Sequence, residues 1–173
     1  MSFVSAVIEP QQFRQALGHF ASGVTVITSQ IAGTPIGFTC GSFYSVSMSP
    51  ALVSFSVKKE SASYPAMRQT GRFAVNILSA GQIELSNLFA QRGADKWSGV
   101  EWSESPGGNP LIAGSVQWID CEIYAEYEAG DHLIVLGEVK ALSQTETQEP
   151  LIYFTGQYRQ LASVTQGAEA STA

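Results

Sequence analysis

The chain has 173 residues and a mass of 18.5 kDa, the size of one domain with a core of its own. Charged residues make up only 14 % and apolar residues 45 %, which excludes long disordered segments and leaves much neutral surface. We therefore expect a homo-oligomer. Fifteen acidic against nine basic side chains give a net charge of −6, which argues against nucleic acid as a partner.

No apolar run approaches the roughly 20 residues that a membrane span needs, and the segment from Met1 to Ser5 lacks the features of a secretory signal. We expect a cytoplasmic protein that does not bind membranes. Cys40 and Cys121 are far apart and have no second ligand nearby, so the sequence signals neither a metal site nor a disulfide. Both are expected to be buried thiols.

The first half of the chain predicts two helices, a hairpin and two further strands. Residues 10–21 have the spacing of a helix with one buried face, formed by Phe13, Ala16, Leu17 and Phe20. A β-rich segment at 24–28 and another at 36–43, joined by a turn at 33–35, predict a hairpin. Residues 51–57 and 73–77 alternate as half-buried strands do, and a short helix is expected at 61–69 between them.

The second half predicts a helix, a long loop and a second hairpin. Residues 82–90 are expected to be helical, whereas four glycines and two prolines in 91–112 predict an irregular loop. Residues 121–127 and 133–141 predict long strands, with Cys121 and Tyr127 on one face and Asp120 and Glu126 on the other. Residues 150–158 predict a short strand and a turn at Gly156.

Strands at short spacing with few helices suggest a mainly β fold, an antiparallel barrel with covering helices. No internal repeat or linker divides the sequence. We expect an N-terminal extension at 1–9, one domain at 10–161 and a flexible C-terminal tail at 162–173.

Charge is distributed unevenly along the sequence. Residues 58–96 hold six basic and three acidic side chains, while residues 101–149 hold ten acidic side chains and one basic side chain, Lys140. Two interpretations stay open: an anionic ligand near the first segment, or two solvated faces of different charge.

Common catalytic motifs are absent. The chain has no G-x-G-x-x-G, Walker A, G-x-S-x-G or H-E-x-x-H pattern, so a cofactor is expected to carry any reaction. Asp131 and His132 do not suggest a serine-type triad, because neighbours on a strand point to opposite faces and are not expected to hydrogen-bond.

The stretch from Gly37 to Pro50 is rich in serine, threonine and glycine where a strand runs into a turn. Its hydroxyls and backbone N–H groups could bind an anion such as a phosphate, or a dicarbonyl ring edge. The alternative is a serine-rich turn whose hydroxyls bond to their own backbone.

Several blocks of the sequence, taken in order, resemble the flavin reductase-like family, the short-chain reductase components of two-component flavin monooxygenases. The resemblance covers about residues 10–161, and the blocks that carry it are Arg14 to Thr28, Gly37 to Pro50, Phe73 to Leu78, Asn87 to Ala90, Gly130 to His132 and Pro150 to Tyr153. The resemblance implies an FMN-binding split β-barrel with a Greek-key core, a homodimer, and FMN or FAD near the dimer interface.

The resemblance also implies which residues bind the cofactors. Those matching the flavin-binding loop are Thr39, Ser42, Phe43, Ser45, Val46 and Ser47. Those matching other flavin-side positions are Val24 and Thr25 beside the ring, Ser61 and Ser63 near the phosphate, and Asn87 and Phe89. His132 matches the NAD(P)H-side histidine, and Tyr158 is a candidate near the nicotinamide.

The sequence is therefore interpreted as an NAD(P)H:flavin oxidoreductase that supplies reduced FAD or FMN to a separate monooxygenase. Hydride transfer is chemistry of the two cofactors, which fits the lack of a visible acid–base pair. NADH is favoured over NADPH, because no arginine pair is placed for a 2′-phosphate. The alternatives are a flavin-binding or small-ligand barrel without reductase activity, and an amine oxidase with tightly held FMN.

His132 is expected to reach over the open face of a bound flavin. A neutral imidazole there could donate one hydrogen bond to the nicotinamide amide or ribose. The alternative is an exposed hairpin histidine without a function.

Overall fold

A computed structural model describes residues 8–144 and 148–162 of the chain. The described part is mainly β with three short helices, as the sequence predicts. The helices are α1 (Pro10–Leu17), α2 (Tyr64–Thr70) and α3 (Ile83–Ala90). The strands are β1 (Ser22–Gly23), β2 (Thr25–Ile31), β3 (Thr34–Cys40), β4 (Tyr44–Met48), β5 (Ala51–Lys58), β6 (Arg72–Ile77), β7 (Trp102–Glu104), β8 (Pro110–Ile112), β9 (Gln117–Ala129), β10 (His132–Leu142), β11 (Ile152–Phe154) and β12 (Gln157–Arg159).

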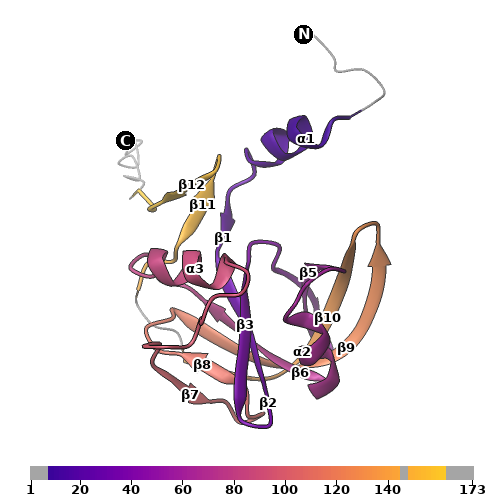
Figure 1. The fold of residues 1–173 in the computed structure, drawn as a ribbon, viewed down its shortest axis with the longest axis vertical. Coiled ribbons are helices and arrows are strands. Elements are labelled where there is room, and N and C mark those ends of the chain that lie inside the picture. The colour runs from indigo at the N-terminus through magenta and orange to yellow at the C-terminus, as the bar shows by residue number, and fades with distance from the viewer. Residues whose placement is uncertain (1–7, 145–147, 163–173) are drawn as a thin grey trace, which may run out of the picture.

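A seven-stranded antiparallel sheet, in the order β3-β2-β6-β9-β10-β5-β4, forms most of the fold (Figure 1). Both predicted hairpins are confirmed: β2 pairs with β3, and β9 pairs with β10. Strand β5 lies beside β10, with Lys58 opposite His132. This register places His132, at the start of β10, beside Lys58, at the end of β5.

Two clusters of buried side chains form the core. In the first, the rings of Phe55 and Phe73 meet edge to face at 5.1 Å, and Tyr64 and Met67 of α2 cover them. In the second, Phe89 of α3 packs in a cluster with Leu78 and Leu151. Helices α2 and α3 are held to the sheet by these apolar contacts, so the core fixes the positions of the loops before α2 and after α3.

A β-bulge corrects the predicted alternation of the second hairpin. Leu136 pairs with Ala125 but Gly137 pairs with Ile123, so Tyr124 is an extra residue on β9. Beyond the bulge, each β9 side chain lies on the face of the sheet opposite to the one that simple alternation predicts. Tyr127 is exposed, and Glu126 turns inward, where it accepts a hydrogen bond from the Tyr64 hydroxyl and forms an ion pair with Arg68 at 2.7 Å. The predicted faces of Glu126 and Tyr127 are therefore wrong.

Asp120, on the face opposite Cys121, is buried because the loop after α3 covers that face of the sheet. Its carboxylate accepts hydrogen bonds from the Asn109 side chain at 2.8 Å and from the Gly107 N–H at 2.7 Å. Asn76 accepts a bond from the Ile112 N–H at 2.8 Å. These bonds hold the predicted irregular loop in place, and its second half forms the short strands β7 and β8.

The predicted helix at 10–21 forms but ends at Leu17, and its buried face is wrong. Phe13, Leu17 and Phe20 are 54 %, 55 % and 64 % exposed, and no residue of α1 is buried. Figure 1 shows α1 at the end of an arm that leaves the main sheet through β1. Within the described residues only the small sheet β1-β11-β12 adjoins this arm, through a hydrogen bond from the Thr155 N–H to the Gly18 carbonyl. Within the described residues, the apolar face of α1 is therefore exposed.

Candidate active site

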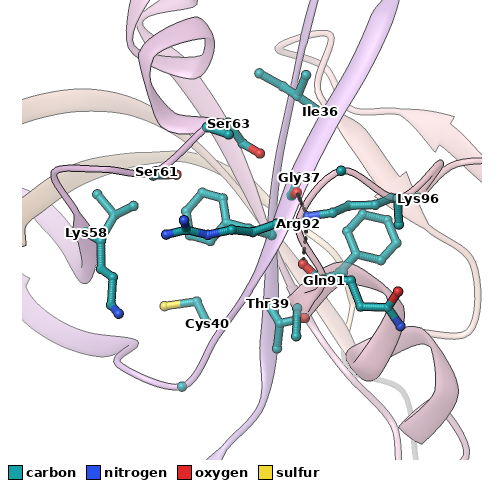
Figure 2. A pocket seen from close by; sticks show the side chains of 18 of the residues that line it. Ile36, Gly37, Thr39, Cys40, Lys58, Ser61, Ser63, Gln91, Arg92 and Lys96 are labelled. Atoms are coloured by element: carbon teal, nitrogen blue, oxygen red, sulfur yellow. Dashed lines mark hydrogen bonds between the residues drawn. The ribbon is translucent and has the colours of Figure 1, made fainter.

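One cavity of about 620 Å³ brings together four segments that are far apart in the sequence (Figure 2). They are residues 35–42 on and after β3, residues 56–63 at and after the end of β5, residues 89–97 at and after the end of α3, and His132 at the start of β10. Strands β3 and β5 are not neighbours in the sheet, so the sheet curls to place both beside the cavity. Its volume lies in the range of small-molecule sites.

Basic side chains and serine hydroxyls converge on this cavity. Lys58 ends β5, Ser61 and Ser63 follow it, and Arg92 enters from the loop after α3. In Figure 2 the Arg92 side chain reaches toward the side on which Lys58 and Ser61 lie. In residues 8–144 and 148–162, neither Lys58 nor Arg92 forms an ion pair with a carboxylate. This arrangement favours a bound anion such as a phosphate group.

Lys96 plays a different part in the same wall. Its ammonium group donates to the Phe89 carbonyl at 2.9 Å and to the Gly37 carbonyl at 3.3 Å, so it ties the loop after α3 to β3. Loss of water around the ammonium group lowers the pKa of Lys96. Lys96 therefore shapes the cavity, and the cations that face a ligand are Lys58 and Arg92.

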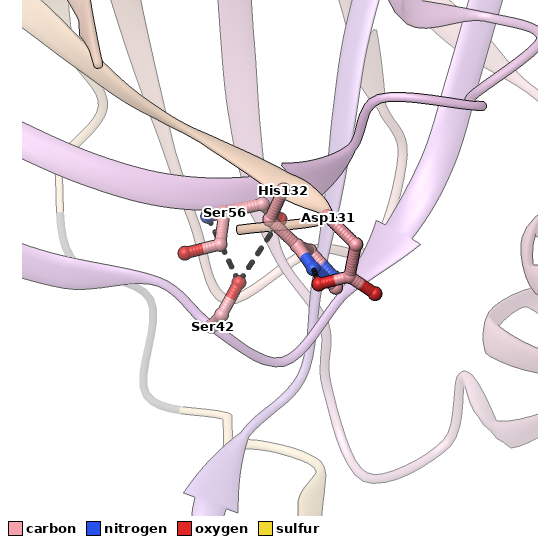
Figure 3. Close-up of polar contacts among 4 residues, drawn as sticks. All are labelled: Ser42, Ser56, Asp131 and His132. Carbon is pink, nitrogen blue, oxygen red and sulfur yellow. Dashed lines mark hydrogen bonds and ion pairs between the residues drawn. The ribbon is translucent and has the colours of Figure 1, made fainter. Parts of the chain in front are cut away.

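The hydroxyl groups of the Gly37–Pro50 stretch bond mainly to backbone. Thr39 donates to the Ser86 carbonyl at 2.6 Å. The Ser42 hydroxyl donates to the Ser56 carbonyl at 3.1 Å and accepts from the Ser56 N–H at 3.0 Å (Figure 3). These bonds join the stretch to α3 and β5 and not to its own backbone, so Thr39 and Ser42 stiffen the cavity wall without forming the turn that the alternative interpretation expects. A local bond of that kind is found at Ser47, which accepts from the Ser49 N–H at 3.3 Å.

Ser42 gives a testable consequence of this placement. Ser42→Ala removes both bonds to Ser56 and loosens the wall. Because this acts on a ligand only through the wall, we expect affinity for the flavin that the resemblance implies to fall by about fivefold, no more than the net contribution of one ordinary hydrogen bond. The loss should be equal for FMN and riboflavin, because the hydroxyl holds backbone and not phosphate. Fluorescence titration with both ligands measures this. A loss seen with FMN alone would show that the Ser42 hydroxyl faces the phosphate after all.

Cys40 lies in the same wall as a buried thiol, as predicted. Its sulfur is 3.3 Å from the Ser42 hydroxyl, and burial raises its pKa. Burial likewise raises the pKa of Cys121, to about 12. Neither thiol is a nucleophile at neutral pH.

The site residues that the resemblance implies fall into two groups in the structure, those that line the cavity and those that lie outside it. Those that line the cavity are Thr39, Ser42, Ser61, Ser63, Phe89 and His132. Those outside it are Val24, Thr25, Phe43, Ser45, Val46, Ser47, Asn87 and Tyr158.

Each residue outside the cavity has another position in the fold. Val24 and Thr25 are buried behind it, where the Thr25 hydroxyl donates to the Cys40 carbonyl at 2.8 Å. The Tyr158 hydroxyl donates to the Asn87 side chain at 2.8 Å, so these two bond to each other. Phe43 packs against the core. Ser45, Val46 and Ser47 lie on β4, an outer strand of the large sheet.

The hydrogen bond that the sequence analysis excluded is present. His132 Nδ1 and Asp131 Oδ1 are 2.8 Å apart (Figure 3). The expectation is wrong because Asp131 lies in the turn before β10 and not on the strand, so strand alternation does not apply to it. Among the described residues no serine hydroxyl bonds to His132, and the pair is not part of a triad.

Sequence reasoning missed Lys58, Arg92 and Lys96 as members of the site. The only signal for them is the excess of basic residues in 58–96. In the described part of the chain, no cluster of histidine, cysteine or carboxylate side chains could hold a metal ion. Nor does any helix there have the length and apolarity to cross a membrane.

Comparison with known proteins identifies the family. The model of the flavin reductase like domain matches residues 17–162. The chain belongs to this family. A flavin-dependent monooxygenase reductase subunit of Rhodococcus jostii is 41 % identical over 151 residues, which cover 87 % of this chain and 77 % of that protein. The flavin reductase of Pseudomonas putida is 39 % identical over 162 residues, with 93 % and 95 % covered.

Solved structures of flavin reductase-like proteins also match the fold. The NADH:FAD oxidoreductase of Streptomyces globisporus, in complex with NAD and FAD fragments, has a TM-score of 0.84 and 36 % identity, with 91 % of this chain and 98 % of that chain covered. These relatives confirm the interpretation of the sequence as a flavin reductase. The relative from Rhodococcus jostii is the reductase subunit of a flavin-dependent monooxygenase.

Proposed function

We propose that the cavity binds FAD or FMN with the phosphate between Lys58, Ser61, Ser63 and Arg92, and that NADH enters on the side of His132. The observation that carries this proposal is the convergence of two cations and two hydroxyl-bearing residues with His132 in one cavity. The Ser61 hydroxyl accepts a bond from the Tyr64 N–H at 3.2 Å, which leaves its own proton for a phosphate oxygen.

A flavin and a nicotinamide, when bound, supply the hydride transfer. The work of the chain is to hold and orient them. Lys58 and Arg92 neutralise phosphate charge, the wall from Gly37 to Ser42 gives a stiff surface, and His132 orients the nicotinamide half. Both cations are exposed, which suits exchange of the flavin with a partner monooxygenase better than permanent retention.

FAD with NADH is the favoured cofactor pair. The relative from Streptomyces globisporus carries this pair in its name. The acidic segment at 101–149 also disfavours the extra phosphate of NADPH. Turnover measured with NADH and NADPH against FAD, FMN and riboflavin tests the choice. A higher kcat/KM for NADPH than for NADH would overturn the choice of NADH. A purified protein that is yellow with bound flavin would favour the alternative of an amine oxidase with tightly held FMN.

We also propose that the reaction takes place in the cytoplasm.

We further propose that the sheet is the core of a split β-barrel and that the protein is a homodimer. Support comes from exposed apolar side chains on α1 and on β4, where Val46 is 50 % and Met48 is 92 % exposed. A second copy seated on β4 would also explain why Ser45, Val46 and Ser47 match a flavin-binding loop yet lie outside the cavity of one chain.

The homodimer predicts the mass in solution. Light scattering at micromolar protein should give twice 18.5 kDa, since stable interfaces bury about 1,200–2,000 Å² and the exposed apolar groups offer such a surface. Met48→Lys, which puts a charge on β4, should shift the mass toward the monomer. A monomeric mass for the unchanged protein would contradict the proposal.

A further inference from the structure

The hydrogen bond between Asp131 and His132 determines which ring nitrogen of His132 carries the proton. Asp131 lies in the turn after β9, 87 % exposed, and His132 begins β10, 35 % exposed and lining the cavity. The carboxylate is an acceptor only, so the proton of the neutral ring is on Nδ1. In Figure 3 the carboxylate lies against one edge of the ring.

The other ring nitrogen then has an unshared electron pair. With its proton on Nδ1, neutral His132 offers Nε2 as a hydrogen-bond acceptor. This differs from the sequence expectation that His132 donates to the nicotinamide. A group that meets Nε2 must carry an N–H or O–H, and the nicotinamide riboside half of NADH has both, in its carboxamide and its ribose hydroxyls.

The hairpin turn holds the carboxylate in place. The Lys59 N–H donates to the Asp131 carbonyl at 3.0 Å, which ties the turn to the end of β5. Gly130 takes a positive φ of 64°, which closes the turn. The hydrogen bond to His132 lowers the pKa of Asp131, so the carboxylate is ionised at neutral pH.

We propose that Asp131 is a positioning residue that holds His132 in the Nδ1-protonated form, so that Nε2 accepts a hydrogen bond from a carboxamide N–H or a ribose O–H of NADH. This rests on the proposed role of His132. Asp131 itself touches no cofactor in this account, and its removal changes NADH use through His132 alone.

Four variants test the proposal in the full-length protein with saturating FAD. Asp131→Ala should lower kcat/KM for NADH by about three- to tenfold and leave the Kd for FAD unchanged. Asp131→Asn, whose amide oxygen can still accept from Nδ1, should recover part of the loss. His132→Ala should lose more, and Asp131→Ala added to it should cost nothing further.

The matched control is Glu128→Ala. Glu128 is an exposed carboxylate 82 % accessible near the same turn, and it pairs with Lys59 at 3.2 Å. The Glu128→Ala substitution removes the same charge as Asp131→Ala but leaves the hydrogen bond to His132 in place, so kcat/KM for NADH should not change. A loss equal to that of Asp131→Ala would overturn the proposal in favour of a general charge effect.

Two readouts separate positioning from a structural role. Nitrogen NMR of the imidazole should show the proton on Nδ1 in the unchanged protein and a shift toward Nε2 in Asp131→Ala; a proton on Nε2 in the unchanged protein would overturn the proposal. Reduced 3-acetylpyridine adenine dinucleotide lacks the amide N–H. If Asp131→Ala has no effect with this analogue, the carboxamide is the donor, and if the loss persists, the donor is a ribose hydroxyl.

The outcomes also separate this inference from the function on which it rests. If His132→Ala lowers kcat/KM for NADH but Asp131→Ala does not, the inference fails and the role of His132 stands. If neither variant affects NADH, the proposed role of His132 fails, and the positioning role with it.

Discussion

Replacing His132 with alanine should lower kcat/KM for NADH by about ten- to a hundredfold, equal to about 1.4–2.7 kcal/mol of transition-state stabilisation. The ring lines the cavity at the start of β10, where it can orient the nicotinamide but need not take a proton. The affinity for flavin should stay nearly unchanged. Steady-state kinetics at subsaturating NADH, together with a flavin titration, measure both quantities.

His19→Ala is the control, because the other histidine of the chain is exposed near the end of α1, away from the cavity. Its kinetics should match those of the unchanged protein. Full activity of His132→Ala at subsaturating NADH would leave His132 as an exposed hairpin histidine, and the nicotinamide site would then lie elsewhere.

Arg92→Ala should weaken binding of FAD and FMN by about tenfold or more, because a charge-assisted bond to phosphate contributes about 1.5–3 kcal/mol. Riboflavin has no phosphate, so its affinity should change by less than about twofold, within the scatter of a surface substitution. Because Arg92 is exposed, the loss should shrink as ionic strength rises. Titration of all three flavins at low and high salt gives the comparison.

Arg72→Ala is the matched control. Arg72 is an exposed arginine at the start of β6, outside the cavity, so its removal should leave all three affinities unchanged. Equal weakening of riboflavin and FMN by Arg92→Ala would place the phosphate away from Arg92.

The sequence predicted most strands because their apolar side chains alternate with period two, as in β5 and β6. It could not predict the bulge at Tyr124, because the extra residue is accommodated by the pairing with β10 and leaves no mark in the β9 sequence alone. The face of α1 was misjudged for a related reason. Phe13 and Leu17 have the spacing of a buried stripe, but spacing does not say which molecule covers it.

The site was predicted in part, and the resemblance contributed most of that part. Serines 61 and 63 and His132 reach the cavity as expected. Arg92 could not be placed in advance, because a loop residue with no periodic pattern gives no direction for its side chain. The hydrogen bond between Asp131 and His132 was not expected because strand alternation was applied to both residues, whereas only His132 lies on a strand and Asp131 lies in the turn before it.

Reductive half-reaction kinetics show whether this protein reduces flavin with NADH and releases it. The protein with one equivalent of FAD is mixed with NADH without oxygen, and the absorbances of the flavin and of the nicotinamide are followed together. We expect one mole of NADH to be oxidised for each mole of FAD reduced, and we expect the reduced FAD to pass an ultrafiltration membrane that retains the protein. If FAD binds but stays oxidised and NADH is not consumed, the protein is a flavin-binding protein without reductase activity.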